Sequence, residues 1–171
     1  LNGGTLCIID EKYILDPANL KVQFEKMNVN FSFFTTALFN QYSEKAIDVF
    51  SNLNTVLIGG ERLSISACNR FHKTYPHIAF YNVYGPTENC TYSTYFKIDK
   101  EYTDDIPIGA PISNSTLYIL DATTNLQPIG VVGEICLGGD GIAKGYLNND
   151  ELTNEKFIDN PYGAGKLYRT G

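Results

Sequence analysis

Short apolar runs recur through the first half of the chain. They cover residues 6–9, 29–34, 55–58 and 78–83. β-branched and aromatic side chains are frequent in these runs, as in strands that are buried on both faces of a sheet. We therefore predict four strands in this half of the chain.

Segments with helical spacing separate the apolar runs. Asp16 is suited to cap a helix, because its carboxylate accepts hydrogen bonds from the first free amides, and Pro17 needs no amide at the first helical position. Leu20, Phe24 and Met27 then recur at helical intervals. The pattern predicts a helix with one apolar face.

Two serines predict further helix starts. Ser43 is expected to cap a short helix, and Ser64 a helix that continues to about Lys73. The short helix is expected to turn three apolar side chains inward, namely Ala46, Ile47 and Phe50. Strand and helix thus alternate through four strands, which indicates a parallel α/β sheet with right-handed crossovers.

The character of the sequence changes after Lys97. Residues 99–107 form a charged connection that contains proline, and helical spacing does not return until about Asp150. We place a boundary at this connection, with one subdomain at residues 1–98 and a second at residues 99–171.

The second subdomain is expected to be rich in β-structure. Residues 116–120 and 132–137 have the composition of strands. The stretch at 121–125 is rich in turn formers, as is typical of connections between antiparallel strands.

Composition and charge narrow the class of protein. The 171 residues are 43% hydrophobic and carry 13 basic and 19 acidic side chains, a net charge of -6. A broad nucleic-acid surface is disfavoured by this balance. The four cysteines lack metal-finger spacing, which indicates reduced thiols and a cytoplasmic protein. No apolar run approaches the roughly 18 residues of a membrane span, so no membrane partner is expected. The cysteines are Cys7, Cys68, Cys90 and Cys136.

Both ends of the sequence suggest a piece of a longer protein. The chain starts without methionine, and the strand-like residues 166–169 run into a final glycine. A site assembled from several segments is therefore expected to be present only in part.

The chemistry is concentrated at residues 82–88, directly after the fourth predicted strand, where open α/β sheets hold their ligands. Tyr84 offers an aromatic face to a purine, Gly85 allows close backbone approach, and Thr87 offers a hydroxyl to a phosphate. Glu88 is a hard oxygen ligand that suits Mg²⁺. A nucleoside triphosphate site and an ordinary surface turn with a capping threonine both fit this heptapeptide.

Longer motifs favour the first interpretation. Tyr-Gly-Pro-Thr-Glu at residues 84–88 resembles a motif of the adenylation domains of nonribosomal peptide synthetases, members of the adenylate-forming superfamily. Residues 133–147 and 168–171 are similar to two further motifs of that family, in the same order, and residues 107–111 also match. The resemblance covers essentially the whole chain.

The resemblance implies both a fold and a set of ligand contacts. The fold would be α/β, with a flavodoxin-like parallel sheet subdomain followed by part of a small distorted β-barrel. Thr87 and Glu88 would be catalytic, with Thr87 at the α-phosphate and Glu88 on Mg²⁺. The nucleotide-binding residues would be Gly60, Glu61, Asn82, Tyr84, Gly85 and Thr87.

The same resemblance implies an amino-acid adenylating ligase. The carboxylate of an amino acid would attack the α-phosphate of Mg·ATP and give aminoacyl-AMP and pyrophosphate. The aminoacyl group would then pass to the phosphopantetheine thiol of a peptidyl carrier protein, beside neighbouring synthetase modules, in antibiotic biosynthesis or other secondary metabolism. Positioning and charge neutralisation suffice for such a step, without a nucleophilic side chain.

Alignment through the motifs also implies a substrate pocket, with an almost entirely apolar lining. Its residues would be Phe33, Leu57, Gly59, Val83, Thr91 and Tyr92. No charge is present to meet an acidic or basic side chain, so a branched aliphatic amino acid fits best. Isoleucine is the first expectation, and valine or leucine are near alternatives, since one methylene changes binding by only about 1–3 kcal/mol.

Several alternatives stay open. The family's phosphate loop and its catalytic lysine have no counterpart in these 171 residues, so we expect the isolated chain to be inactive. Another adenylate-forming enzyme, an acyl-CoA or aryl-acid ligase, would share the fold and the nucleotide site. A flavodoxin-like module that binds a flavin or nucleotide without catalysis is a second alternative, and a docking piece of a synthetase is a third.

Overall fold

The computed structural model describes residues 3–171, which form two compact units. The first unit contains the described residues up to Asn82 together with Lys97–Pro107, and the second contains Val83–Phe96 and Ile108–Gly171. The chain passes between the units within the strands β3 (Ala79–Tyr84) and β4 (Thr94–Lys97), and again after Pro107. The division expected at residues 99–107 stays a prediction.

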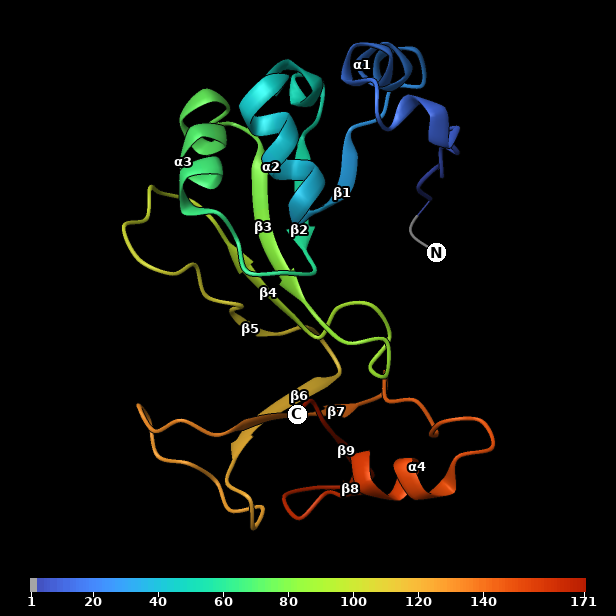
Figure 1. Cartoon of the computed structure of the whole chain (residues 1–171), viewed down its shortest axis with the longest axis vertical. Helices are drawn as coiled ribbons and strands as arrows, with labels where there is room; N and C mark the ends of the chain where they lie inside the picture. The colour runs from blue at the N-terminus through green and yellow to red at the C-terminus, as the bar shows by residue number, and fades with distance from the viewer. Residues whose placement is uncertain (1–2) are drawn as a thin grey trace. The chain divides into compact units, whose positions relative to one another are not determined.

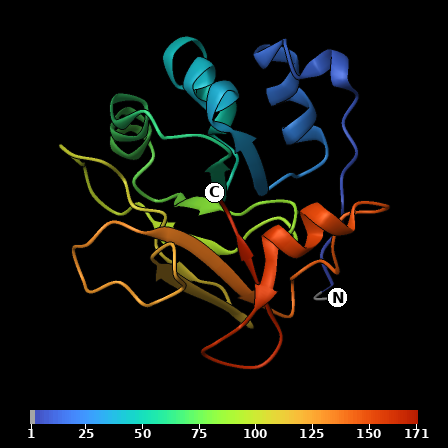
Figure 2. The same ribbon diagram turned by 60° about the horizontal axis from the view of Figure 1, so that its bottom comes forward.

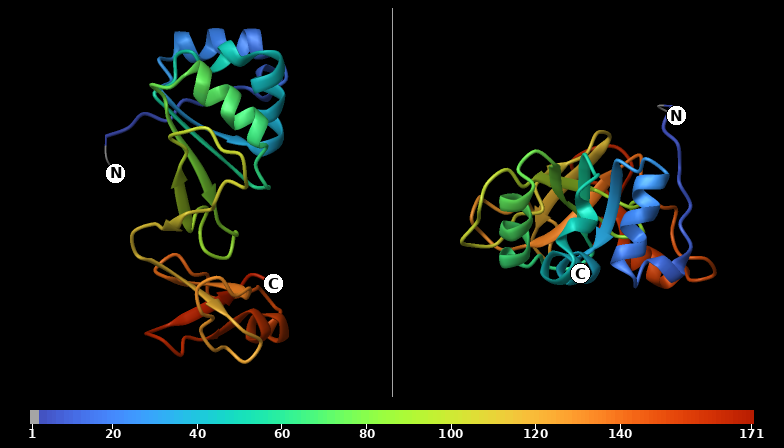
Figure 3. Two further views of the ribbon diagram at one scale, coloured as in Figure 1. Left: turned by 90° about the vertical axis from the view of Figure 1, so that its left-hand side faces the viewer. Right: turned by 90° about the horizontal axis from the view of Figure 1, so that it is seen from above.

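The first unit alternates helices and strands (Figure 1). Its elements are η1 (Glu11–Tyr13), α1 (Pro17–Lys26), β1 (Phe31–Thr35), α2 (Thr36–Lys45), η2 (Ile47–Phe50), β2 (Thr55–Gly59), α3 (Ile65–Thr74) and the start of β3 (Ala79–Tyr84). Strands β1 and β2 are parallel, as predicted. Helix α2 packs against α3, and α1 packs against η2 (Figure 3).

An aromatic cluster forms the core of this unit. Phe71 lies at its centre, with its ring centroid 4.5 Å from that of Phe80 and 5.1 Å from that of Phe50. Phe34 packs on Phe50 edge to face, with the ring centroids 5.1 Å apart. All four side chains are buried. Such ring pairs stabilise a core beyond the area they bury, and they join α3 and η2 to β1 and β3.

Two predicted helix starts are confirmed. Helix α1 begins at Pro17, and the Asp16 carboxylate accepts a hydrogen bond from the Asn19 amide at 3.1 Å. Helix α3 begins after Ser64, whose hydroxyl accepts from the Ala67 amide at 3.4 Å.

The prediction for Ser43 is wrong. Ser43 lies inside α2, and the hydroxyl that caps this helix belongs to Thr35, which accepts a hydrogen bond from the Leu38 amide. Thr35 is the last residue of β1 and keeps an extended backbone, as a helix cap requires. The expected helix around Phe50 is the 3-10 segment η2, which has no side-chain cap.

The strand predicted at residues 6–9 is also wrong. These residues have irregular structure, and the side chains of Leu6 and Ile8 are 87% and 84% exposed. An apolar run becomes a strand only where its backbone pairs with a neighbour, and composition alone does not supply that neighbour.

The second unit is dominated by short strands. After the end of β3, its elements are β4 (Thr94–Lys97), β5 (Ala110–Pro111), β6 (Ser115–Leu120), β7 (Glu134–Gly139), α4 (Asp150–Lys156), β8 (Phe157–Asp159) and β9 (Lys166–Arg169). The order of one sheet is β6-β7-β9-β8, and every pair in it is antiparallel. Helix α4 packs on β8 and β9 (Figure 2).

The other sheet has the strand order β1-β2-β3-β4-β5. It is mixed, because β4 and β5 pair antiparallel whereas β1 and β2 are parallel. The predicted α/β class is therefore confirmed as a mixed sheet with a separate antiparallel sheet. The antiparallel sheet buries a small core of its own, formed by Leu120, Cys136 and Leu167.

All four cysteines are free thiols, as predicted. Among the helices within residues 3–171, none combines the length and the apolar character that a membrane span needs.

Candidate functional site

The predicted site residues are divided between the two units. The first unit holds Phe33, Leu57, Gly59, Gly60, Glu61 and Asn82, and the second holds Val83, Tyr84, Gly85, Thr87, Glu88, Thr91 and Tyr92.

Parallel pairing brings the predicted residues of β1 and β2 together. Phe33 lies opposite Leu57 in the register, and Thr35 lies opposite Gly59. Phe33 remains 39% exposed and Leu57 is half-buried. Both strands therefore present side chains near their carboxyl ends, where α/β sheets hold ligands.

The turn after β2 is fixed by a residue that the sequence reasoning did not identify. The buried Thr36 hydroxyl lies 3.2 Å from the carbonyl oxygen of Gly59 and 3.3 Å from that of Glu61. Between them, Gly60 has a φ of 101°, in the region that favours glycine. Only the position of Thr36, directly after a strand, hinted at this role.

Asn82 is buried at the carboxyl end of β3 with a defined partner. Its side-chain amide donates a hydrogen bond of 2.8 Å to the carbonyl oxygen of Pro107. This bond ties the strand to the connection at Lys97–Pro107, within the first unit. Its predicted contact with adenine stays a prediction.

In the second unit, the turn after β3 closes tightly on itself. The Ser93 amide donates to the Tyr84 carbonyl at 2.7 Å. A Cβ placed on Gly85 would lie 2.8 Å from both the Thr91 carbonyl oxygen and the Tyr92 Cα. The turn thus places Thr91 and Tyr92 beside Gly85, and only a glycine fits at that point.

Glu88 is held by hydrogen bonds at both its side chain and its backbone. Its Oε1 accepts a hydrogen bond of 2.6 Å from the Tyr146 hydroxyl, and its carbonyl oxygen accepts one of 2.8 Å from the Ala143 amide. The Tyr146 hydrogen bond lowers the pKa of Glu88 against the opposing effect of burial, with smaller contributions from Tyr168 and Lys156. Glu88 is therefore ionised at neutral pH.

The partners of Glu88 belong to an aromatic cluster. The Phe157 ring centroid lies 5.5 Å from that of Tyr146 and 5.2 Å from that of Tyr168. Burial, the largest cause, and hydrogen bonding to Tyr146 and Glu88 raise the pKa of Tyr168. The sequence reasoning used both tyrosines to identify motifs at residues 133–147 and 168–171, but it gave neither of them a place in the site.

The donor set at Glu88 fits Mg²⁺ together with a nucleotide. Within residues 3–171, no cluster of three or more His, Cys, Asp or Glu side chains is placed to hold a metal. Mg²⁺ is commonly bound by one or two carboxylates, with substrate phosphates and water completing its shell. One ionised carboxylate is therefore sufficient where phosphates supply the other ligands.

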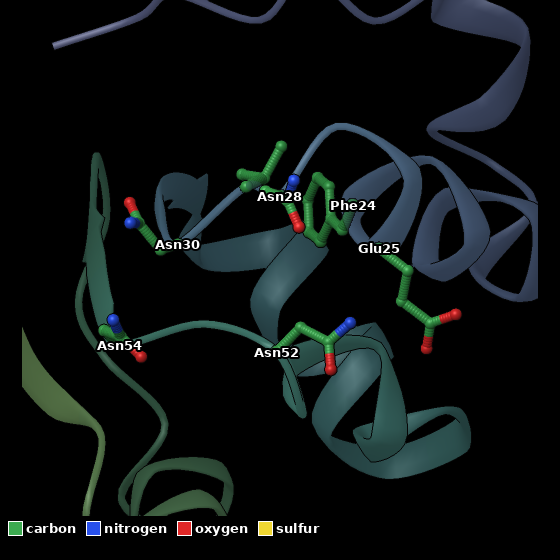
Figure 4. A pocket seen from close by; sticks show the side chains of 7 residues that line it. Phe24, Glu25, Asn28, Asn30, Asn52 and Asn54 are labelled. Carbon is green, nitrogen blue, oxygen red and sulfur yellow. The ribbon is translucent and has the colours of Figure 1, made fainter.

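Two cavities lie in the described part of the first unit. One of about 320 Å³ is lined mainly by asparagines, including Asn30 and Asn54, which precede β1 and β2 (Figure 4). It is thus at the amino ends of these strands, opposite to the predicted site residues. A second, of about 840 Å³, is lined by residues from Gly3 to Ile9 and from Phe24 to Phe33. Phe33 is the one predicted pocket residue among its described lining.

The Glu88 turn follows β3 of an α/β sheet, and such sheets hold their ligands at the carboxyl ends of their strands. A family model described as AMP-binding enzyme matches residues 1–147. The chain belongs to this family, and the family assignment made from the motifs is confirmed.

Peptide synthetases are among its relatives. The chain is 45% identical over 172 residues to Gramicidin S synthase 2 of Brevibacillus brevis, and 43% identical over 172 residues to Tyrocidine synthase 3 of Brevibacillus parabrevis. All of the chain is covered in both comparisons, but it spans only 4% and 3% of the length of these relatives. The chain thus corresponds to one small part of the adenylation machinery of such synthetases.

Solved structures agree with this assignment. PA1221, described as an NRPS protein containing adenylation and PCP domains, superposes with a TM-score of 0.86 at 30% identity. The match covers 99% of this chain and 34% of PA1221. An N-terminal subdomain of NpsA from Klebsiella oxytoca, in complex with 3-hydroxybenzoyl-AMSN, matches with a TM-score of 0.82 at 25% identity, over 91% of this chain and 41% of that one.

Proposed function

We propose that the chain supplies part of the site at which a peptide synthetase activates an amino acid. The substrate carboxylate attacks the α-phosphate of ATP, a P–O bond to the β-phosphate breaks, and aminoacyl-AMP and pyrophosphate form. The observation that carries this proposal is Glu88, an ionised carboxylate held at one oxygen in the turn after β3.

Each side chain of this turn has a distinct role in the proposal. Tyr84 contacts the adenine ring, the Thr87 hydroxyl donates to the α-phosphate region, and Glu88 holds Mg²⁺. When bound, Mg²⁺ neutralises charge on the phosphates. Thr87 is exposed and therefore accessible to a ligand. The turn at Gly60 and Glu61, together with Asn82 and Gly85, completes the nucleotide contacts in the proposal.

The proposed substrate is a branched aliphatic amino acid, isoleucine first and otherwise valine or leucine. Phe33, Leu57 and Val83 support this choice, because they bring apolar surface and no charge to the proposed pocket. Gly59, Thr91 and Tyr92 are assigned to the same lining. Discrimination among the three amino acids rests on single methylenes, so cross-reactivity within this group is expected.

The proposed acceptor of the aminoacyl group is the phosphopantetheine thiol of a carrier protein. The thiolate attacks the aminoacyl carbonyl, a thioester forms, and AMP leaves. Support comes from PA1221, which is described as containing a PCP domain beside its adenylation domain.

Amino-acid-dependent ATP–pyrophosphate exchange tests the proposal. Residues 1–171 would replace the matching segment of PA1221, and exchange would be measured across the amino acids. Exchange that peaks with isoleucine or valine supports both the reaction and the pocket. Exchange with aryl or fatty acids alone refutes amino-acid activation.

Two controls accompany this assay. The isolated 171-residue chain is expected to give no exchange, because the family's phosphate loop and catalytic lysine lie outside these residues. Glu88→Gln in the chimera should reduce exchange about 10–100-fold if Glu88 holds the metal. Full activity of Glu88→Gln would remove Glu88 from the proposal.

A further inference from the structure

Glu88 is held at two atoms by one loop of the second unit. The Ala143 amide binds its carbonyl oxygen at 2.8 Å, and the Tyr146 hydroxyl binds its Oε1 at 2.6 Å. Tyr146 lies 58 residues further along the chain. The loop after β7 therefore fixes both the backbone and the carboxylate of Glu88.

Tyr146 is itself held in place from two sides. Its amide donates to the Thr153 hydroxyl on α4 at 2.9 Å, and that hydroxyl donates to the Asn149 carbonyl at 2.8 Å. Its ring packs edge to face on Phe157, with an interplanar angle of 69°. The position of the phenol is thus set by α4 and by the first residue of β8, and Glu88 does not have to orient it.

One carboxylate oxygen of Glu88 is engaged by this phenol. A carboxylate rotates about its terminal bond, so a free glutamate exchanges its two oxygens and samples many directions. The hydrogen bond at Oε1 restricts that freedom, and Tyr168 is a second hydrogen-bonding neighbour of the same carboxylate. Groups that orient a metal ligand in this way commonly change metal affinity 10–100-fold when they are removed.

We propose that Tyr146 is a positioning residue for Glu88, the carboxylate that would hold the metal, and that it acts through its hydrogen bond to Oε1. This inference rests on the proposed function, in which Glu88 binds Mg²⁺. The effect of Tyr146 is on cation affinity, through Glu88.

Paramagnetic NMR tests the inference on the PA1221 chimera that carries residues 1–171. Mn²⁺ replaces Mg²⁺ and is titrated in the presence of ATP, and the broadening of the Glu88 amide signal is followed. Tyr146→Phe keeps the ring and removes only the hydroxyl. The Mn²⁺ midpoint, which is the Mn²⁺ concentration at half-maximal broadening, should therefore rise 10–100-fold. Glu88→Gln should abolish the selective broadening.

Tyr162→Phe is the matched control. Tyr162 is also in the second unit, and its hydroxyl donates a hydrogen bond of 2.7 Å to the Thr124 carbonyl. The control loses a comparable hydroxyl contact far along the chain from Glu88. An unchanged midpoint for Tyr162→Phe shows that the effect of Tyr146→Phe is not a general loss of order.

The outcomes distinguish the positioning role from the metal role. If Tyr146→Phe matches wild type while Glu88→Gln loses the broadening, the positioning role is wrong and the metal role of Glu88 stands. If Glu88→Gln matches wild type, or wild type shows no selective broadening, the metal role fails and the inference falls with it.

A second variant tests the inference in case Tyr146→Phe does not fold. Thr153→Val keeps the phenol but removes the hydroxyl that binds the Tyr146 amide. It should raise the Mn²⁺ midpoint by a smaller factor than Tyr146→Phe. A wild-type midpoint in folded Thr153→Val would count against the inference.

Discussion

Replacing Gly85 by alanine tests how closely the turn after β3 is packed. A Cβ at this position would lie 2.7 Å from the Ser93 amide nitrogen and 2.8 Å from both the Thr91 carbonyl oxygen and the Tyr92 Cα. All three atoms belong to the backbone, so no flexible side chain can move aside. The turn itself must open to admit the methyl group.

The size of the effect follows from these distances. Each contact is at least 0.6 Å shorter than the 3.4 Å at which ordinary van der Waals contact begins. Overpacking of this kind costs about 1–3 kcal/mol, while the lower entropy of the unfolded alanine chain returns about 0.4–1 kcal/mol. We expect Gly85→Ala to lower the free energy of unfolding by about 1–2 kcal/mol.

Urea denaturation followed by far-ultraviolet circular dichroism measures this change, since the chain has no tryptophan to report on unfolding. Gly4→Ala is the matched control, because a Cβ there meets nothing within 4 Å and the backbone is not in the left-handed region. It should stay within about 0.5 kcal/mol of wild type. A Gly85→Ala chain as stable as this control would refute the close packing of the turn.

Three further predictions concern the core, an ion pair and the thiols. Phe71→Ala removes the central ring of the aromatic cluster and should cost about 3–5 kcal/mol in the free energy of unfolding, measured by urea denaturation; a loss below about 1 kcal/mol would contradict the packing. Burial is the largest single effect and acts to raise the pKa of Glu134, but the hydrogen bonds from Arg169 and from the Gly171 amide, together with nearby positive charge, outweigh it, so the net pKa is lowered. The folded pKa is thus below the unfolded value near 4.3, so this stabilisation is present above that value and is lost as pH falls through the folded pKa. Glu134→Gln should therefore flatten the fall in unfolding free energy on acidification, and an unchanged slope between pH 7 and pH 3 would refute the assignment. A thiol reagent at pH 8 should label the exposed Cys90 in the folded chain, whereas the buried Cys68 and Cys136 should react only after unfolding. Burial raises the pKa of the Cys68 thiol to about 12 and that of the Cys136 thiol to about 11.

Helix starts could be predicted from the sequence wherever a local signal decides them. Asp16 before Pro17 and Ser64 before α3 both act within the next three residues, and both caps are present. Ser43 carries the same type of signal but lies inside a helix. Thr35 already caps this helix at its start. A helix that has started continues through an interior serine such as Ser43.

The strand predicted at residues 6–9 fails for a different reason. An apolar run and a buried strand look alike in composition, but a strand also needs a partner whose backbone lies in register with it. Strands β1 and β2 have such partners in each other, from Phe31 with Thr55 to Thr35 with Gly59. That pairing depends on residues far apart in the sequence and cannot be read from the run itself.

The same distinction separates the parts of the candidate site. Glu88 was found because its neighbours in the chain form a motif, and a motif is local. Tyr146 lies in another motif, and what joins the two is one hydrogen bond between residues 58 apart. Taken one at a time, the motifs show which residue types are present. In the folded chain, those at 84–88, 133–147 and 168–171 contribute Glu88, Tyr146 and Tyr168 to one polar and aromatic cluster. If Tyr146→Phe raises the Mn²⁺ midpoint, the motif at 133–147 acts through the Glu88 carboxylate of the motif at 84–88. These two motifs then have one function rather than two.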